Sequence, residues 1–173
     1  MKIDKKVLIK TFLIKAAIVF VVWQIAYHGF IKPNETIDNT LTEWVTASSV
    51  FGLTLLGFDS SSIDNVIYIN EIQSVKVANG CNGLELVALF LGFLICFPGN
   101  LKSKIVYGIF GSIAIELINI LREITLALNY NYFRATFDIN HKYTYALLVY
   151  AFVFIVWKHW IERYSVIAKK HLQ

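Results

Sequence analysis

The chain has 173 residues, 57% of them hydrophobic and 15% aromatic, and its mean hydropathy is +0.58. These values disfavour an ordinary soluble domain and predict a polytopic membrane protein with one compact domain. The net charge is +4, but the basic residues cluster at the edges of apolar runs, so the charge indicates membrane topology rather than nucleic-acid binding.

Four apolar stretches are predicted to cross the bilayer: residues 11–30, 82–97, 105–128 and 143–160. The first stretch follows a basic start and resembles a signal peptide. No small-residue cleavage site follows it, so we expect a retained span. The predicted fold class is an all-α membrane helical bundle of about four spans, with residues 1–173 forming a single membrane domain.

The segment between the first two spans, residues 31–81, is expected to be extracytoplasmic. It contains a weaker apolar stretch, residues 44–58, which is broken by Thr and Ser and is interpreted as an interfacial or re-entrant helix. Val66–Ile69 and residues 75–77 are rich in β-branched residues on either side of residues 70–74. This pattern predicts a short β-hairpin leading to Cys81.

The basic residues support this topology with both termini inside. The inner segments hold Lys2, Lys5, Lys6, Lys10, Lys102, Lys104, Lys158, Arg163, Lys169 and Lys170, and the outer segments hold Lys32, Lys76, Arg134 and Lys142. Inner segments of membrane proteins carry the excess of Lys and Arg. If residues 44–58 formed a full span, the turn with Lys102 and Lys104 and the basic C-terminus would lie outside. The charge pattern therefore disfavours a span there.

The first candidate for chemistry is Cys81, in Asn79-Gly80-Cys81-Asn82-Gly83-Leu84-Glu85 before the second span. The dipole at a helix N-terminus favours a thiolate, and the flanking glycines allow a close approach of another chain. The alternative is a small buried hydrophobe at a helix cap. Cys96 lies about 22 Å further along the same helix, too far for a disulfide, so Cys81 is expected to be a free thiol.

Arg122 lies in Asn119-Ile120-Leu121-Arg122-Glu123, in the outer half of the third predicted span. An arginine in a span costs about 2.5 kcal/mol or more and is by default a functional candidate. Asn119 is three residues earlier and shares its face. The alternatives are a structural pairing with Glu123, Glu116 or Glu85, or snorkelling to the interface.

His141 opens the fourth predicted span, and histidine is the usual general acid or base near neutral pH. Asp138 is a candidate to orient it, and an ordinary interfacial histidine is the alternative. The topology places Cys81, Arg122 and His141 on the same side of the membrane. A thiolate, a base and a fixed cation together indicate acyl transfer through a thiol. One cysteine and one histidine fall short of a zinc site, so neither metal nor cofactor is expected.

At these residues the sequence resembles the exosortase/archaeosortase family, and its length resembles the short, exosortase-like branch of Bacteroidetes-type bacteria. The resemblance rests on Asn79 to Glu85 opening a span, Asn119 to Arg122 in the next, and Asn140-His141 opening the last. It implies a membrane cysteine protease or transpeptidase with catalytic Cys81, Arg122 and His141. Asn119, Glu85 and Asp138 are candidate supporting residues.

The resemblance also implies partners and a location. The expected substrates are membrane-anchored proteins with a C-terminal sorting tail, and the acceptor of the transfer is open. The expected location is the bacterial inner membrane, with multiple spans and an active site facing the periplasm. The main alternative is a non-catalytic assembly factor or receptor that binds sorting tails. A small transporter is a weaker alternative, since the chain has no visible repeat.

Overall fold

A computed structural model describes residues 5–166. Its helices are α1 (Lys5–Ala26), α2 (Lys32–Asn34), α3 (Thr36–Leu55), α4 (Leu84–Cys96), α5 (Leu101–Tyr132), α6 (Phe137–Ile139) and α7 (Tyr145–Tyr164). Its strands are β1 (Ser60–Ile63), β2 (Val66–Ile69) and β3 (Ile72–Lys76). Single π-helical turns at Tyr27–Ile31 (η1) and Asn140–Thr144 (η4) continue α1 and precede α7, and short 3-10 turns lie at Asn79–Cys81 (η2) and Arg134–Thr136 (η3).

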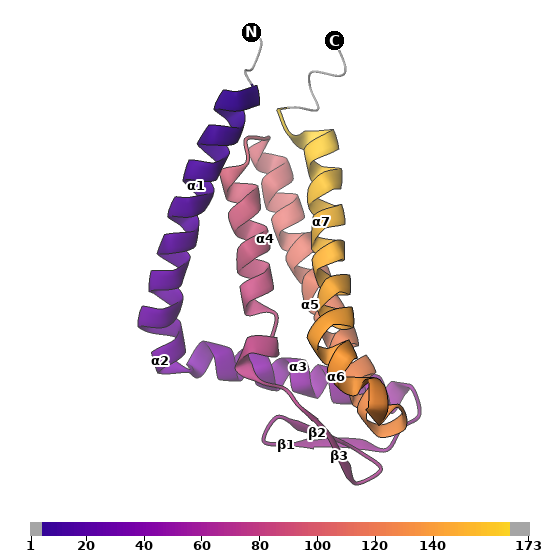
Figure 1. The fold of residues 1–173 in the computed structure, drawn as a ribbon. Helices are drawn as coiled ribbons and strands as arrows, with labels where there is room; N and C mark the ends of the chain where they lie inside the picture. The colour runs from indigo at the N-terminus through magenta and orange to yellow at the C-terminus, as the bar shows by residue number, and fades with distance from the viewer. Residues whose placement is uncertain (1–4, 167–173) are drawn as a thin grey trace.

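Four helices form the body of the molecule, as the sequence predicted. α1, α4, α5 and α7 run along a common direction, while α3 crosses one end of them and the sheet lies beyond α3 (Figure 1). Within residues 5–166, three helical segments are long and apolar enough to cross a membrane: Lys6–Asn34, Leu101–Tyr132 and Arg134–Tyr164. α4 has only 13 residues, or about 20 Å, which is less than the ~30 Å hydrocarbon core of a bilayer.

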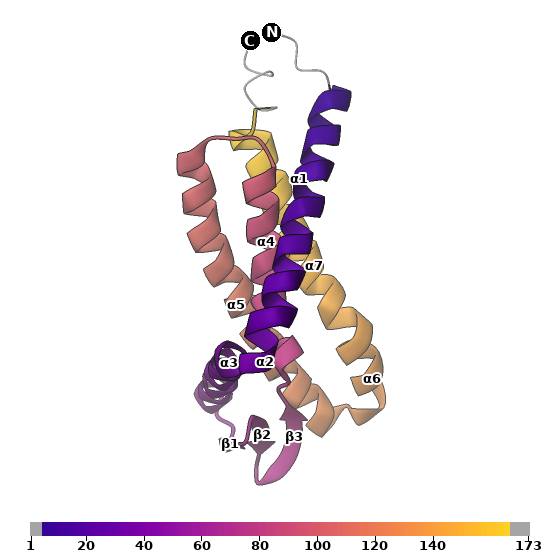
Figure 2. The ribbon, with the colours of Figure 1, turned by 90° about the vertical axis from the view of Figure 1, so that its left-hand side faces the viewer.

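The two predicted groups of basic residues fall at opposite ends of the molecule. The start of α1, the α4–α5 turn and the end of α7 lie at one end, while α2, β3, η3 and η4 lie at the other (Figures 1 and 2). Lys2, Lys169 and Lys170 lie outside the described residues. The start of α1 and the end of α7 therefore lie at the same end of the molecule.

The apolar stretch predicted at residues 44–58 belongs to α3, which begins eight residues earlier than predicted, at Thr36. Its first turns are polar, but their polar side chains face the protein. Asp38, Thr42 and Thr46 are spaced by four residues and are each no more than 2% exposed. The hydroxyls of Thr42 and Thr46 donate to the carbonyls four residues earlier, at 2.7 Å each. These hydroxyls are therefore hydrogen-bonded although they are buried.

The predicted hairpin is confirmed, and it is part of a three-stranded antiparallel sheet in the order β1-β2-β3. Both turns are two residues long and have positive φ: 49° and 63° at Asp64 and Asn65, and 51° and 65° at Asn70 and Glu71. Such turns match the twist of paired strands. The prediction missed β1 because its sequence, Ser-Ser-Ser-Ile, lacks the composition of a strand.

Two buried clusters hold the fold together. One joins α3, the sheet and α5 through residues such as Val45, Ile67 and Leu126, all 0% exposed. The other joins α4, α5 and α7 at the opposite end, around Phe90 and Trp160. There the indole N–H of Trp160 donates to Ser103 Oγ at 3.2 Å, tying α7 to the start of α5. The first cluster is the one that positions the candidate site.

Candidate active site

Cys81 is the last residue of the η2 turn, two residues before the Gly83 that caps α4. Helix α4 begins at Leu84, slightly later than the sequence predicted. The Cys81 side chain is half-buried and packs against the cluster formed by α3, the sheet and α5. Cys81 and Cys96 are both free cysteines. Cys81 thus sits in a short loop whose position depends on its neighbours.

Asn82, directly after Cys81, is fixed to α3 by a buried carboxylate. Its amide donates to Asp38 Oδ1 at 3.0 Å and to the Asp38 carbonyl at 3.2 Å. The hydroxyl of Tyr27, in the η1 turn that continues α1, donates to the other carboxylate oxygen of Asp38 at 3.0 Å. Asp38 and Asn82 are each 2% exposed. One carboxylate therefore joins the end of α1, the start of α3 and the loop that carries Cys81.

Asn79, two residues before Cys81, is held on the same helix. The Thr42 hydroxyl donates to Asn79 Oδ1 at 2.9 Å, and Asn79 Nδ2 donates to Asn39 Oδ1 at 2.9 Å. Both asparagines that bracket Cys81 are thus bound to consecutive turns of α3. Sequence reasoning missed this support. The polar residues at four-residue spacing in the first turns of α3 were the signal that could have indicated it.

Asn119 joins the Cys81 loop to Arg122. Its Nδ2 donates to the Cys81 carbonyl at 2.8 Å, and its Oδ1 accepts from Arg122 Nη1 at 3.2 Å. Asn119 is 0% exposed. The shared face predicted for Asn119 and Arg122 is confirmed, and Asn119 links Arg122 to the backbone of Cys81.

Arg122 pairs with Glu123, one of the three carboxylates that the sequence allowed. Arg122 Nη2 lies 3.0 Å from Glu123 Oε1, with the two side chains 14% and 2% exposed. The guanidinium therefore has a neutralising partner and a fixed orientation, and it also borders a cavity. These constraints suit a cation held ready for a negatively charged group.

Glu116, one turn before Asn119 on α5, lies against the start of α4. A methyl group placed on Gly83 would lie 2.5 Å from Glu116 Oε1. Gly83 also has a φ of +87°, which side-chain-bearing residues rarely adopt. The second glycine of the Cys81 motif therefore meets both a conformational and a steric requirement.

His141 lies in η4 and is exposed. Its ring stacks on Phe137 with a centroid distance of 5.6 Å and an interplanar angle of 2°. Phe137 packs against the same cluster as Cys81. Within residues 5–166, His141 forms no hydrogen bond with Cys81 and none with Asp138, which is also exposed. The structure thus joins Cys81, Asn119 and Arg122 through hydrogen bonds, and places His141 on an aromatic ring beside their cluster.

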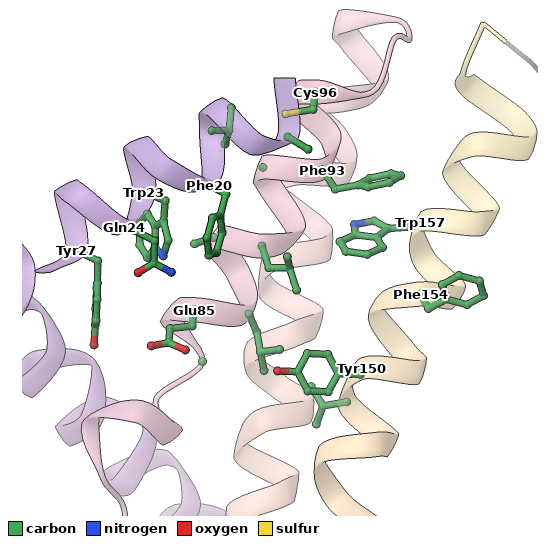
Figure 3. Close-up of a pocket in the computed structure, with 18 of the residues that line it drawn as sticks. Phe20, Trp23, Gln24, Tyr27, Glu85, Phe93, Cys96, Tyr150, Phe154 and Trp157 are labelled. Atoms are coloured by element: carbon green, nitrogen blue, oxygen red, sulfur yellow. The ribbon is translucent and has the colours of Figure 1, made fainter. Parts of the chain in front are cut away.

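A cavity of about 680 Å³ borders this arrangement. It is lined by Gly80, Gly83, Glu85 and Arg122 at the Cys81 loop, and it extends along α1, α4 and α7 as far as Cys96. Figure 3 shows Gln24, Tyr27 and Glu85 at one end and Phe93 and Trp157 towards the other. No group of three or more metal-binding side chains occurs among the described residues.

Comparison with known proteins gives one finding. The family model described as transmembrane exosortase (exosortase EpsH) matches residues 8–157, which is most of the chain. No curated protein matches, and no solved structure matches.

Proposed function

Because the chain belongs to the transmembrane exosortase family, a family of membrane cysteine transpeptidases, we propose that it cleaves C-terminal sorting tails of exported proteins with Cys81 as the nucleophile. The observation that carries this proposal is the Asn119 side chain, which hydrogen-bonds both the Cys81 carbonyl and Arg122. A nucleophile loop and a cation joined through one fully buried amide have a fixed relative position. Fixed positions of this kind are what catalysis needs.

The proposed reaction has two steps. The Cys81 thiolate attacks the carbonyl carbon of the scissile peptide, and the oxyanion that forms is stabilised by Arg122. The C–N bond then breaks, a proton from His141 goes to the leaving amine, and a thioester to Cys81 remains. In the second step His141 takes a proton from the acceptor nucleophile, which attacks the thioester and releases Cys81.

The buried pairs around Arg122 support its role as an oxyanion donor. Asn119 and Glu123 hold two of its nitrogens, so its orientation requires little rearrangement when negative charge develops. The ion pair with Glu123 favours the charged form of Arg122 within the bundle. Arg122 also lines the cavity that reaches Gly80 and Gly83, on either side of Cys81 in the chain.

His141 completes the proposed site from η4. A π-helical turn is locally less regular than an α-helix, and such turns occur often at functional sites. The Phe137 ring holds the imidazole beside the cluster on which Cys81 packs. Catalytic hydrogen bonds are often formed only when the substrate is bound, so we propose that His141 meets the thiol in the complex. Asp138 is proposed to orient it from the same short helical segment.

The finer assignments are also proposals. We place the protein in the inner membrane of a bacterium of the short exosortase-like branch, with the Cys81 end facing the periplasm. The basic residues at the opposite end of the helices support this orientation. Its substrates are membrane-anchored proteins with a sorting tail, a class implied by the family.

A non-catalytic receptor that binds a tail carboxylate through Arg122 is the alternative. It is less well supported, because a receptor does not require the Cys81 loop and Arg122 to be joined through Asn119. The two functions differ in what they require of Cys81. A receptor tolerates Cys81→Ser, whereas a thiol enzyme does not.

Trapping the substrate tests the proposal. Cys81→Ala is expressed beside the wild-type chain and beside Cys96→Ala, which removes the other thiol. We expect uncleaved tail proteins to accumulate and to co-purify with Cys81→Ala only. Quantitative membrane proteomics measures both effects. Equal processing by Cys81→Ala, Cys81→Ser and the wild-type chain would contradict the enzyme and favour the receptor.

A further inference from the structure

Helix α3 carries an exposed apolar stripe on the side opposite its buried polar residues. Ile37, Trp44, Phe51 and Leu55 are spaced by seven, seven and four residues, so they share one side of the helix, which we call the α3 stripe. Their exposed fractions range from 49% to 71%. Exposed apolar surfaces of this kind mark contacts with a membrane or with another protein. The α3 stripe is therefore a candidate interaction surface.

The α3 stripe points away from the sheet. Asn39 and Glu43, on another side of α3, line a hollow together with Ser62 of β1 and Asp64 in the turn after it. The centre of the stripe lies about 100° around the helix from Glu43 and about 145° from Asn39. The sheet lies beyond α3, on the far side from the bodies of α1, α4, α5 and α7 (Figures 1 and 2). The stripe therefore faces towards the membrane rather than the water beyond it.

The α3 stripe is also continuous with apolar surface that a bilayer would cover. Gly52, next to Phe51, lies against α5, because a methyl group placed on it would lie 2.5 Å from Ile124 Cδ1. Leu121 and Leu117, one and two turns earlier on α5, are 58% and 56% exposed. They belong to a helical segment long and apolar enough to cross a membrane. The same leaflet that surrounds α5 would therefore reach the stripe.

We propose that the α3 stripe inserts into the bilayer leaflet on the Cys81 side. Because α3 crosses the end of the spanning helices, it lies in the plane of the membrane surface (Figure 1). A helix in this position buries its apolar face about 5–10 Å deep, at the boundary of headgroups and acyl chains. Trp44 suits this boundary, since tryptophan is enriched at membrane–water interfaces. The exposed carboxylate of Glu43 stays on the water side.

The proposal deepens the function proposed above and rests on it for its consequence. Asp38 and Thr42, on the side of α3 that faces the protein, bind the asparagines on either side of Cys81 in the chain. A leaflet that holds α3 therefore also holds the Cys81 loop at a fixed depth. In this way the membrane surface, through α3, sets the position of the nucleophile.

Site-directed spin labelling tests the contact with lipid. A nitroxide-labelled cysteine replaces Phe51 of the stripe or Ile63 of β1, which is matched in exposure at 62% against 64% but lies on the sheet. A label at Ile18, an exposed apolar residue of α1, marks a lipid-facing position. Each chain carries Cys81→Ala and Cys96→Ala in nanodiscs of phosphatidylethanolamine and phosphatidylglycerol. Collisions of the label with oxygen, which is apolar, and with a polar nickel chelate are measured.

We expect the label at Phe51 to behave like the label at Ile18. A polar chelate enters apolar surroundings poorly, so its collisions at Phe51 should be at least about tenfold rarer than at Ile63. Equal chelate collisions at Phe51 and Ile63 would overturn the proposal, because the stripe would then lie in water. Protection of Phe51 from both oxygen and chelate would also overturn it, because a second copy or a partner protein would then cover the stripe.

A second pair of variants, with both native cysteines present, tests the consequence for Cys81. Phe51→Glu should slow tail cleavage per inserted enzyme about fivefold, which corresponds to about 1 kcal/mol, and Ile63→Glu should leave it unchanged. Equal cleavage by the two variants would overturn the link between the leaflet and the Cys81 loop. Failure of the proposed function has a different signature. In that case the wild-type chain cleaves no tail protein, while the difference between the labels at Phe51 and Ile63 persists.

Discussion

Replacing Asn119 with alanine removes the contact on which the candidate site depends. The Cys81 carbonyl loses a 2.8 Å hydrogen bond, and Arg122 Nη1 loses a 3.2 Å partner. Asn119 is 0% exposed, so alanine leaves a space inside the protein where the amide was. Loss of a part-buried hydrogen bond of this kind costs about 0.5–1.5 kcal/mol of stability. The larger effect should be on catalysis, because both the nucleophile loop and the guanidinium lose a fixed point.

The expected slowing of tail cleavage is about 100-fold per inserted enzyme, the typical cost of displacing a reacting group by about 1 Å. The assay follows cleavage of a tail protein recovered with Cys81→Ala and normalises it to membrane-inserted enzyme. Thermal unfolding in detergent measures the stability change separately.

Asn131→Ala is the matched control for Asn119→Ala. Asn131 is also on α5, and its amide donates to Ser74 Oγ of β3 at 2.6 Å, away from Cys81. We expect Asn131→Ala to lower stability by about 0.5–1.5 kcal/mol with unchanged cleavage per folded enzyme. Equal slowing in both variants, or near-normal cleavage in Asn119→Ala, would refute the positioning role of Asn119.

Three further predictions concern the same site and its topology. Arg122→Lys should cleave at least about 100-fold more slowly at normal abundance, because one ammonium group cannot hold Asn119 and Glu123 together as two guanidinium nitrogens do. Glu123→Gln should have a much milder effect, and near-normal cleavage by Arg122→Lys would remove Arg122 from the proposed site. A membrane-impermeant maleimide should label half-buried Cys81 and not Cys96, which is 3% exposed. Mass spectrometry of labelled cells that finds no adduct on Cys81 would contradict an accessible thiol on the outer side. Reporter fusions after Asn70 and after the last residue should report opposite sides of the membrane, and agreement between them would contradict four crossings.

The sequence alone predicted the helical body, because the information is local. A long run of apolar residues indicates a membrane helix by itself, and three of the four expected stretches overlap helices long enough to span, while the fourth overlaps the shorter α4. The β2–β3 hairpin was visible for a similar reason, since strand composition and turn residues are neighbours in the chain. The order of the Cys81, Arg122 and His141 motifs indicated the family, which the match over residues 8–157 confirms.

Sequence patterns failed to predict segments whose burial depends on contacts with distant parts of the chain. The polar first turns of α3 read as part of a loop because Asp38 and Thr42 look solvent-exposed in the sequence. In the structure they are buried against the Cys81 loop and supply its hydrogen bonds. β1 has little strand propensity of its own and pairs with β2 because a two-residue turn brings it there.

The sequence thus indicated which residues have side chains suited to the proposed chemistry, and the tertiary structure decided which of them contact one another. It allowed three carboxylates as partners of Arg122, and the packing of the bundle left Glu123 as the ion-pair partner while placing Glu116 against Gly83. The link from Asp38 to Asn82 spans 44 residues, and the link from Asn119 to Cys81 spans 38. Contacts at such separations form only when the intervening helices and sheet have packed, because closing those loops costs entropy that local sequence preference cannot supply.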